Sequence, residues 1–360
     1  MTQGTLRPLF PAARRGLAIV VAGALLACSP APAEDQREAG AAVATRGLDA
    51  AMVDRAMTEA RGLERLHAVI IARHGEVIAE ERLRGPDLNT PVNIKSASKS
   101  VLSALAGIAI GEGVLEGVEQ PIAPILSADL PASPDPRLSD ITVGHLLSMQ
   151  AGLGRTSGDQ YGRWVTSPNW VRHALARPFQ DEPGGRMIYS TGTSHLMSAV
   201  LTRASGRSTH DLAQDWLAEP LGIRIPPWPR DPQGVYFGGN DMLMAPRDLL
   251  RFGELYRQDG VIDGRRILPE GWVEESWRSR TVSPWSGNDY GYGWFSRRSN
   301  GHDVRFAWGY GGQMLFIAPS LGLTVVMTSD PSPHPRAESH LPALHAMMDD
   351  LIIPAAIRGA

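Results

Sequence analysis

Strand-like sequence lies near both ends of the chain, while the long middle stretch has helical patterns. Residues 67–73 (HAVIIAR) and 76–83 (EVIAEERL) flank His74-Gly75, and two such runs around a short turn predict a β-hairpin. Three further strand-like runs follow near the end of the chain, at 289–296, 313–319 and 323–329. Because strands bury their apolar faces by joining a sheet, we expect the early hairpin to pair with the late strands in one mainly antiparallel sheet.

The other segments carry helical patterns. The stretch 97–112 consists of small and branched apolar residues and is closed by Gly113, which predicts a buried helix with a glycine stop. Further helices are expected at 48–66, within 114–230, at 246–257 and at 336–351. These patterns predict an α+β fold, a mainly antiparallel sheet flanked by helices with an all-helical insertion. We expect a sheet subdomain over about 47–95 and 231–357 and a helical subdomain over about 96–230.

The composition excludes several classes of protein. The 360 residues include 35 basic and 38 acidic side chains, a formal net charge of −3, without a run of like charge. A nucleic-acid-binding protein carries a basic excess or stripe, so no nucleic-acid partner is expected. The single cysteine, Cys28, excludes an internal disulfide and any multi-cysteine metal site. Since no HExxH motif or histidine cluster occurs, we expect no metal and no cofactor, with His145, His173 and His195 in or beside helices.

The first 27 residues have the form of an export signal. Three arginines and no acidic residue precede the apolar stretch 16–27, which is too short to span a bilayer as a helix. It ends in Leu-Leu-Ala-Cys28, which resembles the lipobox of bacterial lipoproteins. The resemblance implies a signal peptide at 1–27, an acylated Cys28 and a flexible tether at 28–46, and hence a periplasmic domain anchored to a bacterial membrane. Ser29 favours the outer membrane, and an ordinary signal peptide that ends in a cysteine is the alternative.

Lysine is rare, which makes its two positions informative. Of the 35 basic residues only Lys95 and Lys99 are lysines, and Ser96-Ala97-Ser98-Lys99 forms an S-x-x-K at the start of the apolar helix. Residues three apart share a helix face, so the Ser96 hydroxyl and the Lys99 amine can meet. A serine needs an adjacent base to act as a nucleophile, and a desolvated lysine can supply one, whereas arginine does not deprotonate. The alternative is an exposed lysine with Ser96 as a helix cap; Lys95 either tunes the local field or is exposed.

Two further segments suit an active site. Tyr189 follows a Pro-Gly-Gly loop and precedes an apolar helix, where its hydroxyl could face a cleft, although a buried structural tyrosine is the commoner case. The segment 307–313 (AWGYGGQ) precedes an apolar strand. Its glycines permit close approach to a ligand, and a backbone N–H at a strand edge could donate to an oxyanion. A plain turn between strands is the alternative for this segment.

Taken in order, the S-x-x-K, the tyrosine and the glycine-rich strand start resemble the serine β-lactamase and penicillin-binding-protein superfamily. The resemblance runs from about residue 65 to 350 and is strongest to the class C-related branch with its family VIII carboxylesterases and 6-aminohexanoate-dimer hydrolases. It rests on these blocks: NIKSASKSV, ITVGHLLSMQAGLG, PGGRMIYSTG, ASGRSTHDLAQDWLAEPLGI, YFGGNDMLMAPRDLLRFG, YGYGWF and WGYGGQMLFIAP.

The resemblance implies a role for each matching residue. Ser96 would be the acylated nucleophile, Lys99 its base or proton relay, and Tyr189 a proton shuttle to the leaving group. The backbone N–H groups of Ser96 and Tyr310 would form the oxyanion hole. Further substrate contacts would come from Thr191, Trp308, Gly309 and Gly311.

Two departures from the family pattern bear on the substrate. The usual Tyr-x-Asn ends here in Thr191, and the usual Lys-Thr-Gly or His-x-Gly is Ala307-Trp308-Gly309. Without a cation to hold a β-lactam carboxylate, a small ester or amide is the expected substrate rather than a β-lactam. Four aromatic residues could line its pocket or could equally belong to the core: Tyr161, Trp164, Trp170 and Trp308.

Other functions stay open from the sequence. The absence of G-x-S-x-G argues against an α/β-hydrolase. Within the superfamily, a D-amino-acid peptidase or a weak β-lactamase is the alternative to an esterase or amide hydrolase. From another class, the alternative is a catalytically silent, lipid-anchored protein that binds the cell wall.

Overall fold

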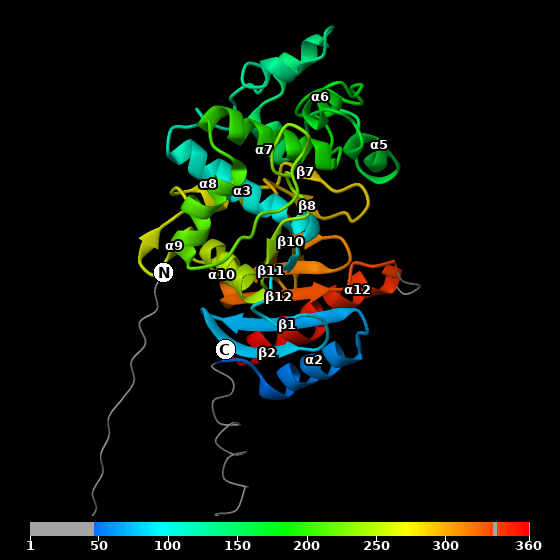
Figure 1. Ribbon diagram of the computed structural model, residues 1–360. Helices are drawn as coiled ribbons and strands as arrows, with labels where there is room; N and C mark the ends of the chain where they lie inside the picture. Colours follow the sequence, from blue (N-terminus) through cyan, green and yellow to red (C-terminus); the bar gives the residue numbers. More distant parts are fainter. Residues whose placement is uncertain (1–46, 334–336, 360) are drawn as a thin grey trace, which may run out of the picture. The chain divides into compact units, whose positions relative to one another are not determined.

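The computed structural model describes residues 47–333 and 337–359, and its centre is an eight-stranded sheet (Figure 1). The strands lie in the order β2-β1-β12-β11-β10-β9-β8-β7, and neighbouring strands pair antiparallel. Val69 of the first hairpin is paired with Met327. The expected pairing of early and late strands, and with it the α+β class, is therefore confirmed. The signal peptide, the tether and Cys28 lie outside the described residues.

The strands of the large sheet are as follows: β1 (Leu66–Arg73), β2 (Glu76–Arg82), β7 (Thr281–Val282), β8 (Asp289–Tyr290), β9 (Phe295–Ser299), β10 (His302–Gly309), β11 (Gln313–Ala318) and β12 (Leu323–Ser329). Two short antiparallel pairs complete the strands: β3 (Val92–Asn93) with β4 (Leu243–Met244), and β5 (Val261–Ile262) with β6 (Arg265–Arg266).

The helices are as follows: α2 (Ala50–Gly62), α3 (Ser98–Gly111), α4 (Val143–Leu147), α5 (Tyr161–Val165), α6 (Trp170–Leu175), α7 (Thr191–Ser205), α8 (Thr209–Ala213), α9 (Glu219–Leu221), α10 (Pro246–Arg257), α11 (Trp272–Trp277), α12 (Ala337–Met347) and α13 (Ile353–Arg358). The expected helices at 48–66, 97–112 and 246–257 are confirmed as α2, α3 and α10. The closing helix runs further than expected, because a π-helical turn, Met348–Ile352, joins α12 to α13.

The sequence prediction was wrong in the region of β8 to β10. The expected single run at 289–296 is broken, because a turn in which Gly291 N–H donates to the Trp294 carbonyl separates β8 from β9. Gly293 in this turn has a φ of 77°, which suits glycine. The eight-residue strand β10 was not expected, although charged residues alternate with apolar ones in its first half, which is the pattern of a half-buried strand. These differences leave the antiparallel topology unchanged.

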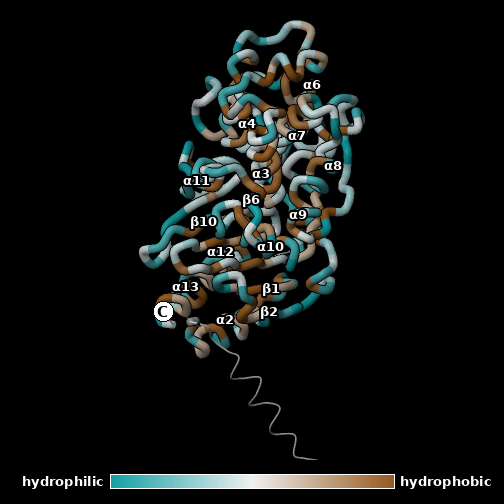
Figure 2. Tube along the Cα trace, turned by 90° about the vertical axis from the view of Figure 1, so that its left-hand side faces the viewer, coloured by the Kyte–Doolittle hydropathy of each residue, from teal (hydrophilic) through white to brown (hydrophobic). Residues whose placement is uncertain are grey.

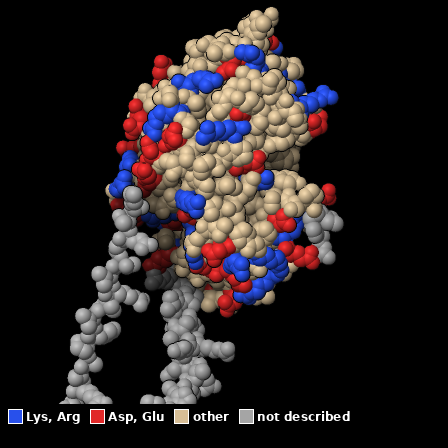
Figure 3. Space-filling model, viewed as in Figure 1, with Lys and Arg blue, Asp and Glu red and all other residues tan. Residues whose placement is uncertain are grey.

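Both faces of the sheet are covered by helices. Along β1, Val69 and Ile71 face a core that includes α2, α12 and α13, while Ile70 and Ala72 face the core of α3, α7 and α10. This coverage explains why β11 and β12 are buried along their whole length rather than at every second position. The surface shown in Figure 3 carries basic and acidic side chains interspersed.

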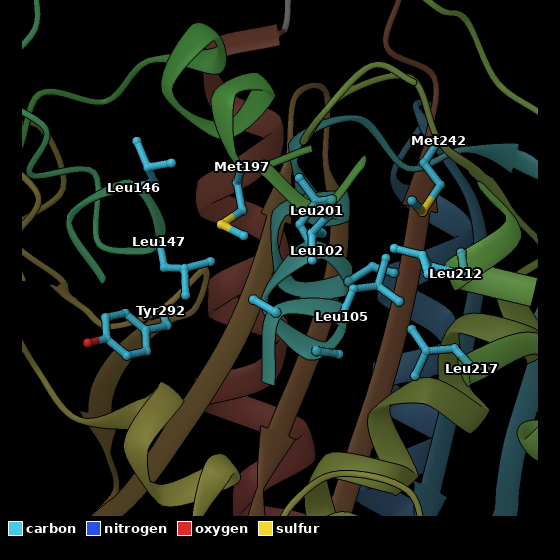
Figure 4. Close-up of a cluster of buried hydrophobic side chains, with 14 of the residues drawn as sticks. Leu102, Leu105, Leu146, Leu147, Met197, Leu201, Leu212, Leu217, Met242 and Tyr292 are labelled. Carbon is cyan, nitrogen blue, oxygen red and sulfur yellow. The ribbon is translucent and has the colours of Figure 1, made fainter. Parts of the chain in front are cut away.

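Helix α3 lies at the centre of the second core and carries the site described below. Every residue from Ser98 to Ala109 is buried, and Figure 2 shows α3 as a largely hydrophobic segment inside the helical part. Leu102 and Leu105 point among leucines and two methionines from α7 and from the segments around residues 146, 212 and 242 (Figure 4). Truncating such a leucine to alanine costs about 2–5 kcal/mol. The packing therefore holds the start of α3 in one position.

None of the helices in the part of the chain that the structure describes is long and apolar enough to cross a membrane.

Candidate active site

Ser96 and Lys99 lie together at the start of α3. Ser96 is half-buried in a single 3-10 turn, Lys95–Ala97, that leads directly into the helix. The Lys99 Nζ lies 3.0 Å from the Ser96 Oγ, which is hydrogen-bonding distance. The S-x-x-K spacing thus gives a contact between the hydroxyl and the amine, as helix geometry requires of residues three apart.

The Lys99 amine is buried without a carboxylate partner among the described residues. The residue is 3% exposed, and Nζ donates to the Gly239 carbonyl at 2.7 Å. Because burial penalises the charged form, it lowers the pKa of Lys99 to about 7. A large fraction of the amine is therefore neutral near pH 7 and can accept a proton. The alternative of an exposed surface lysine is wrong.

Tyr189 completes this group of polar side chains. Its ring lies 4.9 Å from the Lys99 Nζ, and it packs edge-on against Trp285 with ring centroids 5.2 Å apart. Burial raises the pKa of Tyr189 to about 12, and the hydrogen bond with Ser96 partly opposes that rise. The phenol is therefore neutral at pH 7 with its hydroxyl at the serine. The structure thus brings Tyr189 to Ser96 and Lys99, although 93 positions separate Tyr189 from Ser96 in the sequence.

A pocket of about 630 Å³ opens over Ser96, a size that suits a small molecule. Its walls combine aromatic rings with a few polar groups. The lining residues are Lys95, Ser96, Ser157, Gly158, Tyr161, Tyr189, Thr191, Asn240, Asp241, Trp285, Phe295, Trp308 and Tyr310.

The glycine-rich segment after β10 forms one wall of this pocket. Tyr310 is 64% exposed and lines the pocket, whereas Gly309 and Gly311 are not on the wall that the described residues form. A side chain at Gly309 would collide with the Ile94 carbonyl, so this glycine lets β10 pass close to the turn that holds Ser96. Gly311 has a φ of 82° and turns the chain back into β11. The close approach is thus between two parts of the protein, and Tyr310, the next residue, lines the same pocket as Ser96.

Thr191, the first residue of α7, also lines the pocket. Its N–H donates to the Ser157 Oγ at 2.9 Å, and its Oγ1 lies 3.1 Å from the same hydroxyl. Thr191 therefore ties the loop around residue 157 to the helix in addition to lining the pocket. Trp308 also lines the pocket and packs against Phe295 with ring centroids 5.3 Å apart.

The aromatic residues divide between pocket and core. Tyr161 and Trp308 line the pocket, which is the first of the two alternatives that the sequence left open for them. Trp164 and Trp170 instead lie buried against Phe237 and the ring of a histidine of α7. Trp285, which is 51% exposed, also lines the pocket, although it was not among the residues predicted to do so. Its position in the turn-like segment Ser-Pro-Trp-Ser-Gly is the signal that could have found it.

The three histidines considered in the sequence lie in helices, as expected. His195 in α7 is fully buried, with Nε2 3.1 Å from Asp231 Oδ2 and Nδ1 accepting from the Gly238 N–H. His145 shares a capping box with Thr142 at the start of α4. Among residues 47–333 and 337–359, no cluster of histidine, cysteine or acidic side chains is arranged to hold a metal ion.

Two charged residues that the sequence analysis did not place in the site also line the pocket. The Lys95 Nζ lies 3.0 Å from Asp241 Oδ1 across the wall beside Ser96. Asn240, next to this aspartate, donates to the Tyr161 hydroxyl at 3.3 Å. The pair of Lys95 and Asp241 is electrically neutral, so it places a donor and an acceptor in the pocket without a net charge.

Solved structures share this arrangement of sheet and helices. A protein from Bacillus anthracis assigned as a 6-aminohexanoate-dimer hydrolase is 17% identical over 83% of this chain and 81% of its own, with a TM-score of 0.69. EstCE1, a hydrolase with promiscuous acyltransferase activity, is 20% identical over 82% and 98%, with a TM-score of 0.66. A D-stereospecific amidohydrolase from Streptomyces sp. is 18% identical over 82% and 98%, with a TM-score of 0.63.

These identities are low, so the three structures establish the fold, and the family rests on the sequence itself. Comparison with curated proteins found no match. A sequence model of the family described as Beta-lactamase matches residues 53–346, most of the chain. The ordered blocks around Ser96, Tyr189 and Trp308 all fall within that match. The chain therefore belongs to the beta-lactamase family, within the superfamily of serine β-lactamases and penicillin-binding proteins.

Proposed function

We propose that this β-lactamase-family serine hydrolase cleaves small, uncharged esters or amides through an acyl-enzyme on Ser96. The observation that carries the proposal is the 3.0 Å contact between the Ser96 hydroxyl and a buried lysine amine whose pKa is lowered to about 7. A neutral amine at that distance can take the proton of the serine as its oxygen attacks a carbonyl carbon.

The order of proton transfers follows from the two pKa values. At pH 7 Lys99 is largely neutral, whereas Tyr189, with a pKa raised to about 12, holds its proton. Lys99 therefore takes the serine proton while the oxygen–carbon bond forms. The protonated amine then returns the proton through the Tyr189 hydroxyl to the leaving oxygen or nitrogen, and the bond to that atom breaks. Attack by water on the acyl-enzyme repeats these transfers and releases the acid and free Ser96.

The negative oxygen formed during each attack needs donors that are already in position. The backbone N–H groups of Ser96 and Tyr310 are the proposed donors, because β10 passes close to the turn that holds the serine. Removing one such donor typically lowers kcat by about 10²–10³.

The lining of the pocket supports an uncharged substrate. Aromatic rings of Tyr161, Trp285, Phe295 and Trp308 supply apolar contact, and the charges of Lys95 and Asp241 cancel. The names of the structural neighbours, a dimer hydrolase, a hydrolase with acyltransferase activity and an amidohydrolase, agree with ester or amide substrates.

A substrate panel tests the proposal. Purified protein is assayed with p-nitrophenyl acetate and butyrate, nitrocefin, 6-aminohexanoate oligomers and D-alanyl peptides, with Ser96→Ala as the control. We expect turnover of the short esters that Ser96→Ala lacks. Preferential cleavage of nitrocefin or D-alanyl peptides would assign a β-lactamase or peptidase instead, and no turnover of any compound would favour a silent cell-wall-binding protein.

We further propose, from the sequence of residues 1–46, that the protein is exported and acylated on Cys28. A host that expresses the full chain with radiolabelled palmitate should label it and retain it in the membrane fraction. Cys28→Ala should remove both the label and the membrane retention; labelling of that variant would contradict the proposal.

A further inference from the structure

The wall of the pocket beside Ser96 holds an ion pair that the hydrolytic steps do not use. Lys95 and Asp241 line the pocket, and their side chains are 24% and 23% exposed. Each side chain carries one charge, and 146 positions separate the two residues in the sequence. Their contact is therefore formed only by the fold, at the place where a substrate would lie.

The backbone at both residues is unusual. Lys95 has a φ of 51° and Asp241 a φ of 54°, in the left-handed region that few residues other than glycine adopt. Lysine is not among the residues enriched there, and such conformations persist only where surrounding contacts impose them. Asn93 supplies two of these contacts, because its Oδ1 accepts from the Lys95 N–H at 2.9 Å and its Nδ2 donates to Asp241 Oδ1 at 2.7 Å. The structure thus holds the pair in place at a cost in backbone strain.

The hydrogen bonds around this ion pair leave N–H groups of Lys95 and the Oδ2 of Asp241 available to a ligand. Asp241 Oδ1 accepts from both Asn93 and Lys95, whereas no hydrogen bond from the described residues reaches Oδ2. The Lys95 ammonium has three N–H groups, and one of them is directed to Asp241. A pocket wall that presents an N–H donor beside a carboxylate acceptor matches a ligand group that presents an acceptor beside a donor.

We propose that Lys95 and Asp241 together bind a terminal carboxamide of the substrate, with its oxygen at Lys95 and its N–H at Asp241. This inference rests on the proposed function, and it names the class of substrate that the site selects. A primary carboxamide carries its carbonyl oxygen and one N–H on the same edge, so it meets both partners at once. A carboxylate is repelled by Asp241 and an ammonium group by Lys95, because each charge faces a like charge as well as an opposite one.

The test uses four p-nitrophenyl esters whose acyl chains are nearly isosteric. The chains are derived from hexanoic acid and end in a carboxamide (adipamate), a carboxylate (adipate), a methyl ketone (6-oxoheptanoate) or an isopropyl group (6-methylheptanoate). A second series of butyrate esters carries the same four end groups on the alcohol part. Its hydrolysis is measured by the release of butyric acid. In at least one of the two series we expect the kcat/KM for the carboxamide to exceed that for the isopropyl compound by about tenfold or more, since a buried polar site discriminates strongly against a group that leaves it unpaired.

Variants separate recognition from a merely structural role. In Lys95→Met and Asp241→Leu, which remove the donor and the acceptor, the ratio of carboxamide to isopropyl kcat/KM should fall to about one, while Lys95→Arg should keep part of it. The matched control is Asp263→Leu, because Asp263 also has a φ near 50° and an ion pair, with Arg251, but does not line the pocket. This control should keep the wild-type ratio. If the variants slow all four esters equally and leave the ratio unchanged, or if the carboxylate compound is preferred, the inference is wrong.

A binding measurement keeps the inference testable without turnover. Ser96→Ala is titrated with the methyl esters of adipamic acid and of 6-methylheptanoic acid, and the fluorescence of Trp285 and Trp308 reports binding. Tighter binding of the carboxamide that is lost in Ser96→Ala/Asp241→Leu supports the inference even if the enzyme hydrolyses no ester. Equal binding of both compounds overturns it, whereas hydrolysis of the esters with equal binding would overturn the inference and leave the proposed function standing.

Discussion

The two lysines of the chain lie four positions apart but in opposite environments. Lys99 is buried against the Gly239 carbonyl and the Tyr189 ring, and no carboxylate in the described part of the chain contacts it. Lys95 lies on the pocket wall and pairs with Asp241. Burial lowers the pKa of Lys99 to about 7. The same side-chain type is thus buried beside a carbonyl at one end of a short turn and ion-paired at the other.

The loop at residues 238–241 links these two environments. Lys99 donates to the Gly239 carbonyl, and Lys95 pairs with Asp241 two residues further on. Gly238 in turn donates to the ring of His195, which is itself held by Asp231. A buried histidine in α7 therefore helps to position the loop that contacts both lysines.

The largest expected effect is the loss of Ser96. A fluorescent fluorophosphonate should label the wild-type protein, and Ser96→Ala should abolish the label and lower ester kcat by at least about 10³-fold, because no other group can form the acyl-enzyme. In-gel fluorescence and p-nitrophenyl butyrate kinetics measure both effects. Unchanged labelling of Ser96→Ala would show that another residue is the nucleophile.

Replacing Lys99 distinguishes the base from a simple cation. Lys99→Arg keeps a positive charge but cannot give up its proton, so kcat should fall by about 10²–10⁴-fold. Lys99→Met, which matches the size of the chain and carries no charge, should lose activity to the same extent. Circular dichroism checks that both variants are folded. Wild-type rates from Lys99→Arg would refute the need for a neutral amine.

The pH dependence of acylation should report the same amine. Because Lys99 must be neutral to accept the proton and its pKa is lowered to about 7, kcat/KM should fall about tenfold per pH unit below pH 7 and level off above about pH 8. Stopped-flow release of p-nitrophenol over pH 5–9, corrected for spontaneous hydrolysis, gives the profile. A profile that still rises tenfold between pH 8 and pH 9 would contradict the lowered pKa of Lys99.

The smallest effect is on stability, and its sign follows from proton linkage. Lys99 has a pKa of about 7 when folded and 10.5 as its ordinary value, so between these pH values the unfolded chain binds more protons. The free energy of unfolding should therefore rise with pH in this window, by up to about 1.4 kcal/mol per pH unit from this group. Urea unfolding of the wild type and of Lys99→Met at pH 7, 8 and 9 isolates this contribution. Parallel stability profiles for the two proteins would contradict the lowered pKa.

Local patterns predicted the fold well where one residue type dominates a segment. The hairpin around His74, helix α3 and helix α10 follow from apolar patterns, from Gly113 after α3 and from Pro246 in the first turn of α10, all of which act locally. The prediction failed at β8 to β10, where a turn with two glycines breaks one apparent strand and where β10, although its charged and apolar residues alternate, was not proposed. Burial of both sheet faces, which decides these strands, depends on helices far away in the sequence.

The sequence alone was sufficient to predict the contact between Ser96 and Lys99, because three positions along a helix bring two side chains together whatever surrounds them. The scarcity of lysine pointed to the same place. The tertiary structure decided how that amine behaves, since its pKa depends on burial by segments as distant as Gly239. It also decided the walls of the pocket: Asp241, Trp285 and Tyr310 reach Ser96 from separate loops, and the pairing of Lys95 with Asp241 spans 146 positions that no local pattern connects.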